Sequence, residues 1–156
     1  MAAHKQPRIA VLLPCYNEEA TIAATVAGFR EALPDAAIYV YDNNSGDRTR
    51  EIAAKSGAIV RSERQQGKGH VVRRMFADVE ADVYVMADGD LTYDPASAPE
   101  MASLLLADVV PAAGTVDVAL LALEVGFELG AARLAFGHLG LREQEVDDLV
   151  LIQGRA

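Results

Sequence analysis

The chain alternates between short apolar runs and segments with the period of an amphipathic helix. The apolar runs, each bounded by turn-forming residues as buried strands usually are, cover residues 9–13, 37–41, 58–60 and 83–87. Between the runs, apolar side chains recur every three or four residues, as from Ile22 to Leu33, and this period favours helices. Strands that alternate with helices form a parallel sheet through right-handed crossovers. The alternation therefore predicts an α/β fold with a twisted, mostly parallel sheet flanked by helices.

Local signals predict where several of these elements begin and end. Pro14 is expected to end the first strand because proline has no backbone N–H for the ladder. Asn17 is expected to cap the first helix, and Asp47 to cap the second, over residues 48–55. Residues 61–70 have the polar, basic composition of a loop.

The pattern is less regular beyond residue 94. A helix is expected to begin near Pro99, which suits a first helical position, and a fifth strand near residues 108–110. After residue 110 the sequence is apolar with weak periodicity. It allows a strand over residues 123–129 and a helix over residues 141–149 without favouring a place for either.

Composition is typical of a soluble globular domain. With 156 residues, 51% hydrophobic and 24% charged, the chain can build one domain with a substantial core. The formal net charge of −9 argues against nonspecific nucleic-acid binding, which needs a basic face. No apolar run approaches the roughly 18–20 residues of a membrane-spanning helix.

The cysteine and histidine residues argue against a disulfide, a zinc site and a cysteine nucleophile. The single cysteine, Cys15, excludes an internal disulfide and favours a reducing compartment, so we expect a cytoplasmic protein. The N-terminus lacks the apolar core of a signal peptide. His4, His70 and His138 lie far apart and do not support a zinc site. No histidine stands in a motif that would activate Cys15 as a nucleophile.

Polar clusters follow three of the predicted strands, at residues 15–19, 42–47 and 88–90. The carboxyl ends of parallel strands lie along one edge of a sheet, where ligands of open α/β folds bind. The three clusters are therefore expected to form one site.

The cluster at Asp88-Gly89-Asp90 is the most informative of the three. Two carboxylates at the end of a buried strand repel each other and need water or a cation. Such a pair can hold Mg²⁺ or Mn²⁺ through hard oxygen ligands. The alternative is a polar turn in which Gly89 adopts a left-handed conformation.

Four motifs in order resemble family 2 glycosyltransferases, which are nucleotide-sugar enzymes. They are Leu13-Pro-Cys-Tyr-Asn-Glu-Glu19, Asp42-Asn-Asn-Ser-Gly-Asp-Arg-Thr49, Gly67-Lys-Gly69 with Arg73 and Arg74, and Asp88-Gly-Asp90. The resemblance covers roughly residues 8–110 and is closest to bacterial enzymes of lipid-linked sugars and surface polysaccharides. It implies the Rossmann-like GT-A nucleotide-diphospho-sugar transferase fold, incomplete at its C-terminal acceptor half.

The first motif, by this resemblance, contacts the nucleoside of the donor. Pro14 belongs to the donor-binding loop, Tyr16 lies near the base, and Glu18 or Glu19 lies near the ribose. Without a ligand, Tyr16 would be a half-buried turn aromatic. The two glutamates would then complement the dipole of the first helix.

The remaining motifs, by the same resemblance, contact the base, the diphosphate and the metal. Asp42 accepts a hydrogen bond from the base, although an Asx turn is the alternative. Lys68 and Arg73 face the diphosphate, unless they belong to a solvated basic loop. Asp90 ligates Mg²⁺ or Mn²⁺, and Asp88 contacts the ribose, the metal or its water.

The expected function is a metal-dependent transfer of a sugar from a UDP- or GDP-linked donor to an unknown acceptor. Polyprenyl phosphate and a polysaccharide precursor are candidate acceptors, with peripheral attachment at the inner membrane face. The rival hypothesis is a non-catalytic nucleotide-sugar-binding module or a fragment without the acceptor site. A sugar nucleotidyltransferase is disfavoured because Pro14-Cys-Tyr-Asn17 replaces its glycine- and arginine-containing loop.

The last expectations concern the domain division and the C-terminal residues 111–156. Residues 1–110 are expected to form the nucleotide-sugar-binding domain, and residues 111–156 an unassigned apolar and acidic tail. This tail resembles no acceptor region of the family, so we expect a divergent, truncated or frame-shifted end and leave the catalytic base unassigned. Its apolar character also suggests a homodimer.

Overall fold

A computed structural model describes residues 6–109 and 119–123. The strands are β1 (Ile9–Cys15), β2 (Ala37–Asp42), β3 (Ile59–Ser62), β4 (Val83–Ala87) and β5 (Ala119–Leu123). The helices are α1 (Ile22–Ala32), α2 (Thr49–Lys55), α3 (Lys68–Asp78) and α4 (Ala98–Val109), with the 3₁₀ turn η1 (Pro95–Ser97) before α4.

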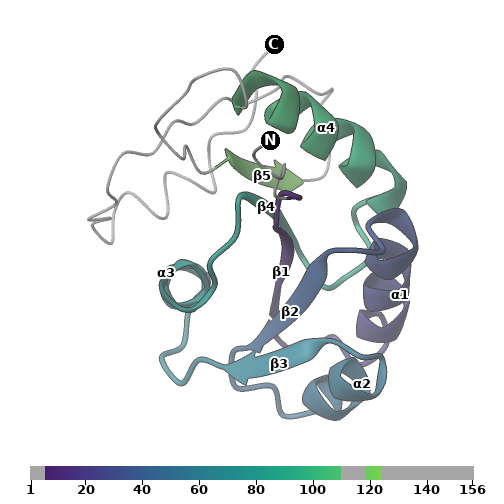
Figure 1. Ribbon diagram of the computed structural model, residues 1–156. Coiled ribbons are helices and arrows are strands. Elements are labelled where there is room, and N and C mark those ends of the chain that lie inside the picture. The colour runs from purple at the N-terminus through teal and green to yellow at the C-terminus, as the bar shows by residue number, and fades with distance from the viewer. Residues whose placement is uncertain (1–5, 110–118, 124–156) are drawn as a thin grey trace.

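The described strands form one parallel sheet in the order β3-β2-β1-β4-β5 (Figure 1). A helix lies between each two strands that are consecutive in sequence, because parallel strands need a crossover connection. This arrangement confirms the predicted α/β fold. All five strands end at the same edge, so the polar clusters that follow β1, β2 and β4 are brought together there.

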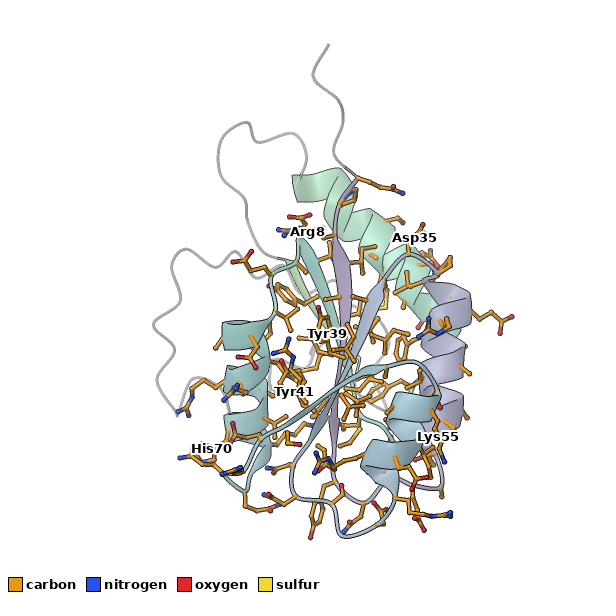
Figure 2. The ribbon with its side chains drawn as sticks, turned by 60° about the horizontal axis from the view of Figure 1, so that its bottom comes forward. Arg8, Asp35, Tyr39, Tyr41, Lys55 and His70 are labelled. Atoms are coloured by element: carbon orange, nitrogen blue, oxygen red, sulfur yellow. The ribbon has the colours of Figure 1, made fainter. Side chains whose placement is uncertain are left out.

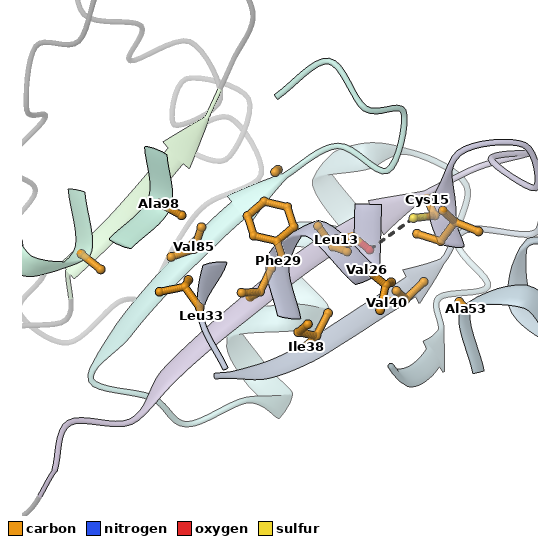
Figure 3. Packing of buried hydrophobic residues seen from close by; sticks show 14 of the residues in the cluster. Leu13, Cys15, Val26, Phe29, Leu33, Ile38, Val40, Ala53, Val85 and Ala98 are labelled. Carbon is orange, nitrogen blue, oxygen red and sulfur yellow. Dashed lines mark hydrogen bonds between the residues drawn. The ribbon is translucent and has the colours of Figure 1, made fainter. Parts of the chain in front are cut away.

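One face of the sheet is covered by α1, α2 and α4 (Figure 1). Their buried side chains meet those of β1, β2 and β4, and Figure 3 shows Phe29 of α1 lying against this layer. Phe29 is completely buried, and burial of such a side chain contributes about 1.5–3 kcal/mol to stability. The predicted apolar stripe from Ile22 to Leu33 is therefore the core-facing side of α1.

The opposite face is covered by α3. Val71, Val72 and Met75 of this helix are buried against Leu12 of β1 and Tyr41 of β2. Figure 2 shows Tyr39 and Tyr41 on the sheet and His70 on α3. Arg8 and Asp35, which precede β1 and β2, lie at the opposite end of the sheet from His70. The first turn of α3 therefore lies near the carboxyl edge.

The first strand is longer than predicted. Pro14 and Cys15 continue β1 and pair in register with Tyr41 and Asp42 of β2. Pairing of β1 with β4 reaches only Leu12. Pro14 therefore has a strand partner on one side alone, a position in which a missing N–H is tolerated.

The predicted cap at Asn17 is wrong. Asn17 has a positive φ of 57°, and α1 begins only after Thr21. Instead of capping, the Asn17 side-chain oxygen accepts the Gly46 N–H at 2.8 Å. Asp47 does act at the start of α2, where its carboxylate accepts the Thr49 N–H at 2.9 Å.

Further boundaries differ from prediction. Arg61 and Ser62 belong to β3, not to the loop predicted over residues 61–70. Lys68, Gly69 and His70 are the first residues of α3, not the end of a loop. The helix predicted near Pro99 is confirmed as α4, but it includes Asp108 and Val109, which were predicted to begin a strand.

The fifth strand is β5, from residues that the sequence pattern left unassigned. It pairs with β4, so the sheet extends past the predicted domain boundary at residue 110. Most of the strand proposed for 123–129, and all of the helix proposed for 141–149, fall outside the described residues. Among the residues described, no helix has both the length and the apolar composition needed to cross a bilayer.

Candidate functional site

A pocket of about 340 Å³ opens at the carboxyl edge of the sheet. The loop after β1, the loop after β2, the start of α3 and the loop after β4 contribute its walls. Its lining residues are Pro14, Cys15, Tyr16, Glu18, Asn43, Gln66, Gly67, Lys68, Val71, Asp88 and Asp90. The expected convergence of three strand-end clusters on one site therefore occurs in the structure.

Lys68 and Asp88 face each other across this pocket. The Lys68 Nζ lies 3.1 Å from Asp88 Oδ1 and 3.2 Å from Asp88 Oδ2. Both side chains are partly exposed, at 42% and 34%. The pair thus joins the first residue of α3 to the residue that follows β4.

Asp90 is held as a carboxylate. Its Oδ1 accepts hydrogen bonds from the backbone N–H, at 3.0 Å, and from the hydroxyl of Thr92. Burial raises the pKa of Asp90, but the hydrogen bonds from Thr92 outweigh it and leave the pKa below its ordinary value. An ionised carboxylate at the pocket wall can ligate a divalent cation.

Gly89 lies between the two aspartates for a steric reason. A Cβ added there would lie 2.6 Å from the Cys15 sulfur. Gly89 is not among the described glycines with positive φ, so the left-handed turn considered from the sequence does not form. Its carbonyl accepts a hydrogen bond from the Thr25 hydroxyl at 3.1 Å, which ties the loop to α1.

Negative charge accumulates around Glu18. Burial raises the pKa of Glu18, and the nearby charges of Asp90 and Asp88 raise it further, against a hydrogen bond from Thr21. Burial also raises the pKa of the Cys15 thiol, with Glu18 adding to the effect. The raised pKa keeps Cys15 a protonated thiol at neutral pH.

Asn43 is a structural part of the site that the sequence did not single out. Its side chain is buried, donates to the carbonyls of Glu63 at 3.0 Å and Gln65 at 2.8 Å, and accepts the Gly67 N–H at 2.8 Å. Asn43 therefore fixes the start of α3 against the end of β2. Its place in a run of turn formers did not distinguish it from Asn44.

Asp42 is buried at 2% exposure beneath the loop that follows β2. Its Oδ2 accepts the Ser45 N–H at 3.3 Å and lies 4.0 Å from the Arg50 guanidinium. Among the described residues, its Oδ1 is buried without a hydrogen-bond partner. Such an acceptor is costly unless a ligand or water satisfies it.

Comparison with known proteins identifies the family. Residues 10–121 match the glycosyl transferase family 2 profile. The chain belongs to glycosyl transferase family 2. This confirms the resemblance that the four motifs carried.

Two similar proteins each match nearly two thirds of the chain. Protein RfbJ of Shigella flexneri is 55% identical over 98 residues, which are 63% of this chain and 76% of RfbJ. The low-salt glycan biosynthesis hexosyltransferase Agl6 of Haloferax volcanii is 37% identical over 102 residues, 64% of this chain and 25% of Agl6.

Solved structures show the same fold. Glucosyl-3-phosphoglycerate synthase of Mycobacterium tuberculosis has a TM-score of 0.58 at 32% identity, over 64% of this chain and 40% of the synthase. Another structure of that synthase, a complex with Mn²⁺, UDP-glucose and phosphoglyceric acid, has a TM-score of 0.58 at 31% identity. The chain therefore spans well under half of the synthase and about a quarter of Agl6.

The family 2 motif residues divide into two groups in the structure. Pro14, Tyr16, Glu18, Lys68, Asp88 and Asp90 line the pocket, with Tyr16 exposed at 53%. Glu19 does not line it, because its carboxylate accepts the Arg48 N–H at 3.0 Å. Arg73 lies half-buried on α3, and neither it nor Asp42 is among the lining residues.

Asp88 and Asp90 are the candidate metal-binding side chains of the pocket. Among the described residues, no group of three or more His, Cys, Asp and Glu side chains is placed to hold a metal ion. Asp88 and Asp90 are two hard oxygen donors, and this set fits a cation whose other ligands are phosphate oxygens and water.

Proposed function

We propose that the chain is the donor-binding part of a metal-dependent glycosyltransferase that uses a nucleoside-diphosphate sugar. The observation that carries the proposal is the pocket in which Lys68 and the start of α3 face Asp88 and Asp90. A cation and a helix N-terminus both favour phosphate. Two carboxylates favour Mg²⁺ or Mn²⁺. A diphosphate with a bound metal offers phosphate to Lys68 and the helix N-terminus, and a cation to the two aspartates.

Four lining residues, and the buried Asp42 outside the lining, then have roles in donor binding. Asp88 and Asp90 hold the cation, Lys68 contacts the diphosphate, and Glu18 contacts the ribose. The buried Oδ1 of Asp42 accepts a hydrogen bond from the base. When bound, the cation stabilises the negative charge that develops on the departing nucleoside diphosphate.

The acceptor is proposed from the sequence resemblance and from one further relative. We infer a polyprenyl phosphate at the inner face of the cytoplasmic membrane, or a polysaccharide precursor. A relative 29% identical over 101 residues is the dolichol-phosphate mannosyltransferase of Pyrococcus furiosus, of which the match covers 29%. Peripheral membrane attachment and homodimerisation stay predictions from the sequence.

Calorimetry with UDP-glucose and GDP-mannose in the presence of Mn²⁺ tests the proposal. We expect one of the two donors to bind, and Asp90→Ala to lower its affinity at least about tenfold, because a charged ligand is lost. Asp35→Ala, at the exposed turn between α1 and β2, is the matched control and should bind as the wild type does.

Sugar release and transfer to polyprenyl phosphate are followed in the same samples. Donor binding with neither reaction would favour the non-catalytic module. Failure of the wild type to bind UDP or GDP donors with Mn²⁺ would refute the proposed function.

A further inference from the structure

The ion pair between Lys68 and Asp88 occupies the place where metal and diphosphate are proposed to bind. The Lys68 ammonium lies within 3.2 Å of both oxygens of the Asp88 carboxylate. The two residues lie 20 positions apart in sequence, at the start of α3 and after β4. Their contact therefore crosses the pocket instead of stabilising one element.

This contact competes with cation binding at the same carboxylates. An ammonium bound to Asp88 takes the lone pairs that a metal would use, and its charge repels a divalent cation. Asp90 lines the same pocket as Lys68 and Asp88. The Lys68 charge therefore lies in the pocket that a divalent cation would have to enter.

The start of α3 is anchored beside the pocket. Asn43 holds the Gly67 N–H at 2.8 Å and the preceding loop through two carbonyls. Release of Asp88 must therefore come from the Lys68 side chain, whose long, flexible stem can swing to another anion.

We propose that Lys68 is a specificity-determining residue that makes metal uptake depend on a diphosphate. This rests on the proposed function. In the free protein Lys68 neutralises Asp88 and disfavours a bare divalent cation. A diphosphate gives the ammonium a new partner, and Asp88 is released for the cation. The site thus selects the cation together with the nucleoside diphosphate.

Thermodynamic linkage gives this proposal a quantitative form. If UDP tightens Mn²⁺ binding by a given factor, Mn²⁺ must tighten UDP binding by the same factor. UMP offers one phosphate group and leaves the metal fewer ligands. It is therefore expected to tighten Mn²⁺ binding less than UDP does.

The test measures free Mn²⁺ by electron paramagnetic resonance with the 156-residue chain, alone and with saturating UDP. We expect UDP to tighten Mn²⁺ binding about 10- to 100-fold in the wild type. Lys68→Met should bind Mn²⁺ alone about three- to tenfold more tightly than the wild type, with a smaller effect of UDP. Lys68→Arg retains the charge and should resemble the wild type.

Arg64→Met is the charge-matched control. Arg64 is an exposed residue of the loop before α3 and does not line the pocket. The loss of this charge should change Mn²⁺ affinity less than about twofold, since exposed charges are screened by salt. Circular dichroism checks that each variant folds, and Lys68→Gln replaces Lys68→Met if the latter does not.

Two outcomes would overturn the inference. One is a Lys68 variant that binds Mn²⁺ alone no more tightly than the wild type while the wild type binds UDP with Mn²⁺. The other is an equal increase in Mn²⁺ affinity in Arg64→Met. That result would mean that the net charge of the protein, and not the position of Lys68, controls Mn²⁺ binding. Absence of UDP binding by the wild type would instead refute the proposed function.

Discussion

At the scale of single residues, the contact between Gly89 and Cys15 sets the geometry of the site. The Cβ position of Gly89 lies 2.6 Å from the Cys15 sulfur and 3.4 Å from Ile22 Cδ1. The sulfur is buried at the end of β1, within the core, so it has little room to move. The two aspartates beside Gly89 therefore lie where the loop packs against β1 and α1.

We expect Gly89→Ala to destabilise the fold by about 1–3 kcal/mol, the usual cost of overpacking. Urea unfolding measures the change. Gly46→Ala is the control, since no atom lies within 4 Å of the Cβ position of Gly46. The double variant Cys15→Ala/Gly89→Ala removes the sulfur that causes the clash. If its two substitutions were simply additive, the proposed contact would not be the cause.

At the scale of elements, the position of α3 depends on the loop before it. Asn43 makes three hydrogen bonds to this loop from a buried position, at 5% exposure. They satisfy the carbonyls of Glu63 and Gln65 and the N–H of Gly67. The pocket wall that carries Lys68 is therefore anchored to the end of β2.

Asn43→Ala should lower the free energy of unfolding by about 1–3 kcal/mol because buried backbone groups lose their partners. It should also weaken donor binding, since Lys68 is no longer held in place. Asn44→Gly is the comparison. It removes only exposed hydrogen bonds to the same loop, from the Asn44 amide to the Arg64 carbonyl at 3.0 Å and to Gln66 Oε1 at 3.1 Å. Glycine accepts the positive φ of 66° at this position. Unfolding curves that show equal losses in the two variants would contradict the anchoring role.

At the scale of the whole molecule, a charged cluster links β2, β3 and α3 on the side away from α1. Asp78 accepts hydrogen bonds from Arg74 at 2.7 Å and from Tyr41 at 3.3 Å, and lies 3.6 Å from Arg61. The hydrogen bond from Arg74 is the largest of the effects that lower the pKa of Asp78. Burial raises the pKa of Tyr41 to about 12, so its hydroxyl donates at neutral pH.

This cluster makes stability depend on pH in the acid range. The pKa of Asp78 is lower in the folded state, so its stabilisation is complete above the unfolded value of about 3.9. It is lost as the pH falls through the folded pKa. We expect Asp78→Asn to be less stable than the wild type at pH 7 and to lose less stability below about pH 4.

Thermal unfolding between neutral pH and pH 2 measures this difference. Asp35→Asn, at an exposed turn, is the control. Parallel acid profiles of Asp78→Asn and the wild type would show that the cluster does not carry the pH dependence.

Sequence prediction succeeded for features set by neighbouring residues and failed for features set by contacts between residues far apart in sequence. The apolar runs predicted β1 to β4, because alternation and turn residues are local properties of the chain. The boundary at Pro14 was wrong because its tolerance depends on how far β4 pairs with β1. The helix cap predicted at Asn17 was wrong because the Asn17 side chain binds the N–H of Gly46, 29 residues away, instead of capping a helix.

The same distinction applies to the candidate site. Motif order placed Tyr16, Lys68 and the two aspartates together, since strand ends share one edge of a parallel sheet. The sequence did not separate Glu18 from Glu19, because both suit the first turn of the helix that was predicted to begin after Asn17. In the structure Glu18 lines the pocket and Glu19 binds the Arg48 N–H.

The amino-acid sequence by itself determined the order of the first four strands and of the helices between them, the family, and the edge at which polar residues gather. These follow from periodicity and motif spacing along the chain. Only the tertiary structure showed that the Cys15 sulfur requires glycine at position 89, that Asn43 anchors the loop before α3, and that Lys68 pairs with Asp88. Those features are contacts between segments distant in sequence, and only packing of the sheet and helices brings their atoms within reach.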